Sequence, residues 1–168
     1  MLIRAYGSYW NPDVVDWGAK GAGNRGHLNG DLRLHEQKQS VDFWDAKGIY
    51  VLHDEFKSIY VGQAYAGTLG PRLREHLTDR FAGRWDMFSW FSISSVTKRG
   101  FIRDPGQRVV SPKVVNDTLE ALAILVADPA LNRKRESIPS AIDVEQSKTR
   151  RPQTIRWYLE TILSKLNG

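Results

Sequence analysis

The sequence contains no cysteine among its 168 residues, and this absence removes several kinds of chemistry. Without thiols the chain has no disulfides, no zinc–thiolate site and no thiol nucleophile. It also has no uninterrupted apolar run of about 18 residues, so no membrane span is expected. Residues 1–10 carry no apolar stretch of secretory-signal length, and we expect a cytoplasmic protein. The hydrophobic content of 41% is enough for a packed core.

The net charge of +5 is unevenly distributed along the chain. Residues 1–47 hold six Lys or Arg and six Asp or Glu, so the whole excess lies in residues 48–168. Segment 97–113 carries five basic residues against Asp104 alone, and segments 133–135 and 148–151 add two further basic clusters. Basic patches are typical of proteins that bind a polyanion, nucleic acid above all. A solvated basic surface is the alternative interpretation.

The first 47 residues predict an ordered extension rather than a tail. They contain Trp10, Trp17 and Trp44, half of the six tryptophans, and large aromatic side chains usually pack. At the other end, residues 137–149 are polar and predict a loop. Residues 153–166 predict an amphipathic helix, with an apolar face that packs on the core.

The middle of the chain predicts an alternation of strands and helices. Residues 48–53 and 58–63 predict a β-hairpin around a polar turn at 54–57. The remaining expected elements are a helix at 71–80 with leucines at 69, 73 and 77, a strand at 87–96, a basic loop at 100–107 and a helix at 112–126.

Two tyrosines, Tyr50 and Tyr60, lie in the predicted hairpin. If the turn holds an odd number of residues, they are directly opposite on one face of the sheet and their hydroxyls are neighbours. If the number is even, they lie on opposite faces. The sequence leaves both arrangements open, and simple packing of two strand tyrosines is the alternative to a functional role.

Arg72 and His76 are four residues apart in the predicted helix, which places them on the same helix face. Leu73 and Leu77 follow them directly, so an apolar stripe runs beside this polar pair. We interpret the apolar stripe as the packing face and the polar pair as flanking a site. An exposed arginine and histidine without a function is the alternative.

Glu120 lies within an apolar run at 119–126, so we expect it on a largely buried helix. A buried carboxylate needs a partner, and a divalent cation is one solution. Two structural alternatives remain open. Asp117 and Glu120 have the spacing of a helix-capping box, and a salt bridge to an arginine would also satisfy the carboxylate.

The ordered set of motifs resembles the GIY-YIG nuclease family. The set consists of Gly48-Ile49-Tyr50, Tyr60-Val61-Gly62, Arg72-x-x-x-His76, Glu120 and Asn132, and valine replaces the isoleucine of the second motif. The resemblance covers residues 48–135. It implies an α/β (α+β) fold with a small three-stranded antiparallel sheet flanked by helices. Residues 1–47 then form an N-terminal extension, and residues 136–168 a loop and a C-terminal helix.

The resemblance also implies roles for these residues in hydrolysing phosphodiester bonds. It implies Tyr50 as general base, with Tyr60 orienting water or phosphate, Arg72 clamping the phosphate, and Glu120 holding one Mg²⁺ or Mn²⁺ ion. Asn132 matches an asparagine that follows this helix in the family. A free tyrosine has a pKa of about 10 and is a poor base near neutral pH, so His76 either accepts its proton or replaces it as the base.

We expect an endonuclease whose substrate is DNA. The expected partner is therefore nucleic acid, and no membrane partner is expected. The expected phosphate contacts come from basic residues around the site, namely Lys98, Arg99, Arg103, Arg108, Lys113, Arg133 and Lys134. Cutting both strands favours a homodimer. A toxin-like RNA nuclease and a nucleic-acid-binding module with a silent active site are the alternatives.

Overall fold

The computed structural model describes residues 1–19, 25–32, 39–107, 109–127, 138 and 140–148. The strands are β1 (Ala5–Trp10), β2 (Asn29–Leu32), β3 (Gln39–Asp42), β4 (Gly48–Asp54), β5 (Lys57–Ala64), β6 (Met87–Ser92), β7 (Ser95–Val96), β8 (Ile102–Arg103) and β9 (Ile142–Gln146). The helices are a short 3₁₀ turn (Pro12–Val14), α1 (Leu69–Glu75) and α2 (Pro112–Ala127). No helix in these described ranges has the length and apolar character that crossing a membrane requires.

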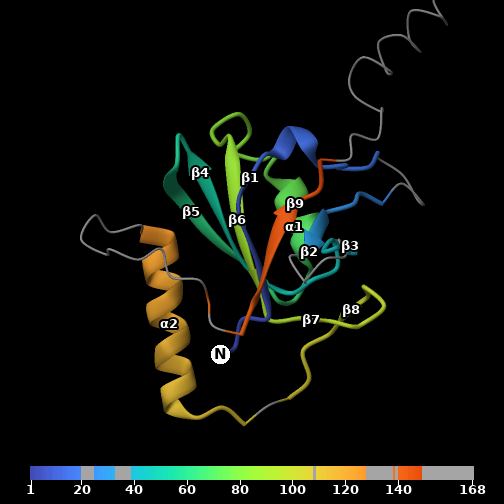
Figure 1. The fold of residues 1–168 in the computed structure, drawn as a ribbon. Coiled ribbons are helices and arrows are strands. Elements are labelled where there is room, and N and C mark those ends of the chain that lie inside the picture. Colours follow the sequence, from blue (N-terminus) through green and yellow to red (C-terminus); the bar gives the residue numbers. More distant parts are fainter. Residues whose placement is uncertain (20–24, 33–38, 108, 128–137, 139, 149–168) are drawn as a thin grey trace, which may run out of the picture.

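Seven strands form one mixed sheet, in the order β3-β2-β9-β1-β6-β4-β5 (Figure 1). β1 and β9 run parallel, and the other neighbouring pairs are antiparallel. The expected small three-stranded sheet is therefore wrong. The three strands predicted within residues 48–96 exist as β6-β4-β5, but they are only one end of a larger sheet. β1 pairs with the edge of β6 that a three-stranded sheet would leave open, which protects that edge from other chains.

The additional strands come from the two segments outside the predicted core. Residues 1–47 supply β1, β2 and β3, and β9 forms where residues 137–149 predicted a loop, so that prediction is also wrong. A strand forms at β9 because it has partners on both sides, β1 in parallel and β2 in antiparallel orientation. The helix predicted at 153–166 lies outside the described residues.

A bulge in the β4–β5 hairpin decides where Tyr60 points. The turn has two central residues, Glu55 and Phe56, both with positive φ, as tight hairpin turns require. This even count alone would put Tyr50 and Tyr60 on opposite faces. However, the register shifts between Leu52 and His53, and Ile59 is the extra residue. Tyr50 therefore pairs with Gly62, Leu52 pairs with Tyr60, and both tyrosines lie on one face as diagonal neighbours.

The two faces of the sheet carry separate cores. The first core contains Tyr50, Leu52, Phe88 and Trp90 from the strands, together with Leu69 and Leu73 of α1, Trp10 and Trp44. The second core contains Tyr6, Val51 and Phe91 with Ala121 of α2. Because adjacent strand residues point to opposite faces, α1 and α2 cover opposite faces of the sheet, as Figure 1 also shows.

Helix α1 is shorter than the predicted 71–80 and is anchored by the N-terminal segment. The amides of Leu69 and Gly70 donate to the carbonyls of Ala46 and Trp44, each at 2.9 Å. The Trp44 ring lies against Gly70 so closely that a side chain there has no room. The helix ends at Glu75, and Leu77, expected in the apolar stripe, is 37% exposed.

Helix α2 forms close to its predicted position at 112–126, but it is not largely buried. Thr118 and Ala121 are the buried residues of α2, and Leu119 is 62% exposed. Hydrogen bonds tie the helix to the rest of the described chain: the Leu2 amide donates to the Thr118 hydroxyl at 3.2 Å, and the Ser58 hydroxyl donates to the Val126 carbonyl at 2.8 Å. An apolar run did not predict burial here because one sheet face covers only one side of the helix.

Candidate active site

Tyr50, His76 and Asp79 form a hydrogen-bonded chain on the α1 face of the sheet. The Tyr50 hydroxyl lies 2.7 Å from His76 Nε2, and His76 Nδ1 lies 2.7 Å from a carboxylate oxygen of Asp79. Tyr50 is 0% exposed and His76 is 3% exposed, whereas the Asp79 side chain is 36% exposed. The chain therefore runs from the buried sheet face to the surface.

Aromatic rings enclose the His76 imidazole. The Tyr60 ring centroid lies 5.3 Å from that of His76 and 6.2 Å from that of Tyr50, and the Phe81 ring contacts both His76 and Tyr60. The Trp85 indole N–H donates to the His76 backbone carbonyl at 3.3 Å. These contacts fix the imidazole in the orientation that points Nε2 at Tyr50.

Gly62 makes room for the Tyr50 ring. A Cβ atom added at Gly62 would lie 2.8 Å from Tyr50 Cε2 and closer still to the ring carbon and oxygen of the phenol. Real Cβ atoms are not found at such distances. The glycine of the second motif is thus required because the Tyr50 ring of β4 packs directly over the β5 backbone at Gly62.

Arg72 is the cation of the cluster. Its guanidinium forms an ion pair with Glu75, and the two side chains are 41% and 54% exposed. Burial, followed by the neighbouring Tyr60, raises the pKa of Tyr50 to about 12, and the nearby Arg72 acts in the opposite direction. Tyr50 is therefore a neutral phenol at physiological pH and has a proton to donate to His76.

The four residues expected from β4, β5 and α1 thus come together: Tyr50, Tyr60, Arg72 and His76. Only Arg72 and Tyr60 among them have appreciable exposed surface. The exposed Arg72 guanidinium could bind an anion, and the buried Tyr50–His76 hydrogen bond beside it could carry a proton.

Glu120 does not join this cluster. It is exposed and lies on α2, which packs on the opposite face of the sheet. The expectation that it is a buried carboxylate is wrong, because α2 turns only one narrow side toward the sheet. Within the part of the chain that the structure describes, no group of three or more His, Cys, Asp or Glu side chains is placed to hold a metal ion. Because Glu120 lies on the opposite sheet face, it is not placed to hold a metal ion beside Tyr50.

The predicted phosphate-contacting residues are divided between the two faces. Lys98, Arg99 and Arg103 are exposed on the β7–β8 hairpin, whose Val96 and Ile102 pack against the same core as Tyr50. Lys113 is on α2 and pairs with Asp117 at 2.7 Å. The remaining expected site residues, Asn132, Arg108, Arg133 and Lys134, lie outside the described residues.

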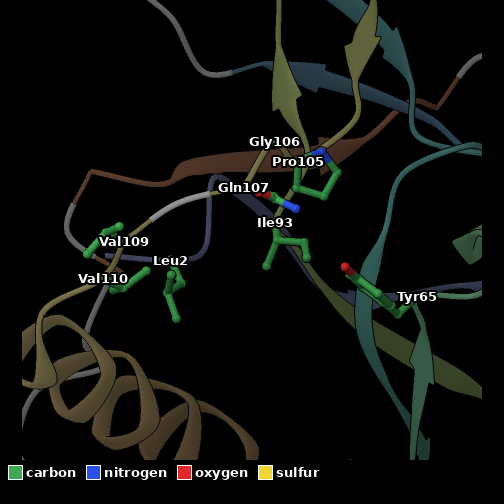
Figure 2. Close-up of a pocket in the computed structure, with 8 residues that line it drawn as sticks. All are labelled: Leu2, Tyr65, Ile93, Pro105, Gly106, Gln107, Val109 and Val110. Atoms are coloured by element: carbon green, nitrogen blue, oxygen red, sulfur yellow. The ribbon is translucent and has the colours of Figure 1, made fainter.

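A surface hollow of about 780 Å³ lies beside the start of α2 (Figure 2). Its walls include Leu2 and Ile93 from the second-core side, Tyr65 after β5, and residues of the loop before α2, Gln107 and Val110 among them. Of the expected catalytic residues, those that the structure describes (Tyr50, Tyr60, Arg72, His76 and Glu120) do not line it, so this hollow is separate from the Tyr50–His76 cluster.

Two members of the cluster did not follow from sequence reasoning. Asp79 comes three residues after His76, a spacing that brings side chains together on a helical turn, and this was the signal available for it. Phe81 carries no such signal, because its contact with His76 depends on the turn after α1. No family model matches the chain, and comparisons with curated proteins and with solved structures found no match either.

Proposed function

We propose that the chain is an endonuclease that hydrolyses phosphodiester bonds, in DNA by preference, at the Tyr50–Tyr60–Arg72–His76 cluster. The observation that carries the proposal is the convergence of these four residues, from two strands and a helix, around the 2.7 Å Tyr50–His76 hydrogen bond. The ordered resemblance of the motifs to GIY-YIG nucleases supports the same assignment.

Arg72 is the proposed phosphate ligand. Its planar guanidinium stays charged and matches two non-bridging oxygens of a phosphodiester. The Arg72 side chain is exposed enough to contact a substrate, and the substrate phosphate would replace Glu75 as the ionic partner of Arg72. The exposed Lys98, Arg99 and Arg103 on the same side of the sheet supply further phosphate contacts, which give affinity without sequence choice.

The proposed chemistry is attack by a water molecule on the phosphorus bound at Arg72. The water oxygen forms the new bond to phosphorus, and its proton goes to the partly exposed Tyr60. Tyr60 passes its own proton to Tyr50, and Tyr50 passes its proton to His76 Nε2, which becomes an imidazolium. The bond from phosphorus to the 3′ oxygen breaks, the 5′ phosphate remains, and the leaving oxygen takes a proton from solvent.

A requirement for Mg²⁺ or Mn²⁺ stays a prediction of the resemblance. Glu120, the expected metal ligand, lies on the other sheet face, so the proposed proton path does not involve it. Rates in Mg²⁺, in Mn²⁺ and in excess chelator measure the requirement directly. A homodimer, expected for double-strand cuts, is tested by light scattering with and without duplex DNA.

The experiment that tests the proposal measures cleavage of supercoiled plasmid and of a labelled RNA, with Arg72→Lys and the matched control Arg74→Lys. We expect nicked plasmid from the wild type, a loss of about tenfold or more in Arg72→Lys because lysine lacks the fork, and wild-type rates in Arg74→Lys. Equal rates in the two variants would contradict the assignment of Arg72.

The complete burial of Tyr50 favours a second candidate function, a nucleic-acid-binding module without cleavage. In that case the wild type cuts neither plasmid nor RNA under any of the metal conditions, yet binds duplex DNA with an affinity that falls as salt rises. Metal-independent or metal-dependent nicking by the wild type excludes this candidate.

A further inference from the structure

Asp79 lies in the turn after α1, where backbone and side-chain contacts fix its carboxylate. Its backbone amide donates to the Glu75 carbonyl at 3.1 Å, and one carboxylate oxygen accepts the Phe81 amide at 2.8 Å. The second oxygen is the one 2.7 Å from His76 Nδ1. Each carboxylate oxygen therefore has its own partner. The hydrogen bond from the Phe81 amide to the first oxygen holds the second oxygen in place against His76.

The carboxylate stays ionised at neutral pH. Desolvation acts to raise the pKa of Asp79, but the hydrogen bonds from the Phe81 amide and from His76, with the charge of Arg80, lower it below its usual value. An ionised carboxylate only accepts hydrogen bonds. The hydrogen between Asp79 and His76 must consequently be on Nδ1.

This hydrogen decides which nitrogen of His76 is available to Tyr50. A neutral imidazole carries one N–H, and with that hydrogen on Nδ1 the lone pair is on Nε2. Nε2 is the atom 2.7 Å from the Tyr50 hydroxyl, so Tyr50 donates and His76 accepts. With the opposite tautomer, the same geometry would leave His76 unable to take a proton from Tyr50.

We propose that Asp79 is a positioning residue that holds His76 in its Nδ1–H form, so that Nε2 accepts the Tyr50 proton, and that then stabilises the resulting imidazolium. The inference rests on the proposed nuclease function for its catalytic meaning, but the tautomer is a property of the free protein. Among the described residues, the ionisable side chains of Tyr50 on β4 and Tyr60 on β5 also contact His76. Tyr50 lies against Nε2, so Asp79 is the partner of Nδ1.

The first measurement is a long-range proton–nitrogen NMR spectrum of the full chain at neutral pH, which reports the tautomer of His76 without any substrate. The variants are Asp79→Asn and, as the matched control, Asp86→Asn, an exposed aspartate further along the same segment. We expect the Nδ1–H form in the wild type and in Asp86→Asn. In Asp79→Asn we expect a mixture, because an amide both donates and accepts. A wild-type spectrum dominated by the Nε2–H form would overturn the proposal.

The second measurement is cleavage kinetics with the same variants. We expect kcat of Asp79→Asn to fall by about 10- to 10⁴-fold with KM changed less than about threefold, because the lost function is proton transfer rather than binding. Asp79→Glu, which restores a carboxylate, should recover part of the loss. An unchanged kcat in Asp79→Asn, despite an altered tautomer, would refute the catalytic role. If the wild type cuts nothing, the nuclease proposal fails, and the spectrum still decides whether Asp79 sets the tautomer.

Discussion

Replacing Gly62 by alanine tests the packing that places Tyr50 beside His76. The new methyl group would overlap the Tyr50 ring, with 2.8 Å to Cε2 and less to the phenol carbon and oxygen. Tyr50 is 0% exposed in the first core, so its ring can move only by displacing its neighbours. The ring must therefore shift and pull its hydroxyl away from His76.

The magnitude follows from two costs. Overpacking a filled core costs about 1–3 kcal/mol. A buried imidazole nitrogen that loses its partner costs about 1–3 kcal/mol more. We therefore expect the free energy of unfolding to fall by at least about 2 kcal/mol. For a chain of this size, that corresponds to a decrease in Tm of roughly 4–8 °C.

The assay is urea denaturation followed by tryptophan fluorescence, with Gly67→Ala as the matched control. A Cβ at Gly67 meets only the Arg72 side-chain stem at 3.9 Å, an ordinary contact, so this variant should stay within about 0.5 kcal/mol of the wild type. If Gly62→Ala is as stable as Gly67→Ala, then the Tyr50 ring does not lie over β5, and the described cluster is refuted.

Three further substitutions have expected outcomes. The pKa of Tyr50 is raised from 10.0 to about 12, so the buried neutral phenol contributes to folding stability below pH 10, and this contribution is lost as pH rises through about 12. Over this range the wild type should lose about 2–3 kcal/mol more of its free energy of unfolding than Tyr50→Phe does. Parallel curves of stability against pH for the two proteins would contradict the raised pKa. Glu75→Gln frees Arg72 from its exposed ion pair, so KM for a DNA substrate should fall by about twofold to fivefold with kcat unchanged, whereas a higher KM would argue against phosphate binding there. Glu120→Gln should keep cleavage within about threefold of the wild type because its side chain lies on the opposite sheet face, and a loss as large as that of a cluster variant would require α2 to be placed differently during catalysis.

Local sequence patterns predicted the hairpin, α1, β6 and α2, because each carries an apolar periodicity or a turn signal of its own. The position of Tyr60 was not predictable in this way. It depends on the bulge at Ile59, which reverses the parity of a two-residue turn. A bulge is a compromise between two strands and has no fixed signature within one of them.

The larger sheet was missed because its added strands depend on distant partners. β2 has the unpromising sequence Asn-Gly-Asp-Leu, yet it pairs with β3 and β9. Gly30 in this strand lies under the Trp10 ring and the Val144 side chain, where any other residue would clash. Tertiary packing thus overrides local propensity in these strands. The same cause explains Glu120, since only the placement of α2 against one sheet face determines which of its residues are buried.

The measurement that tests the central claim most directly is the rate of plasmid nicking by Tyr50→Phe against Tyr65→Phe. Both changes remove a single hydroxyl, one from the buried cluster and one from an exposed residue just after β5. If the Tyr50–His76 pair carries the proton from the attacking water, Tyr50→Phe loses about 10²- to 10⁴-fold in rate and Tyr65→Phe keeps the wild-type rate. Cleavage by Tyr50→Phe at the wild-type rate would contradict the account.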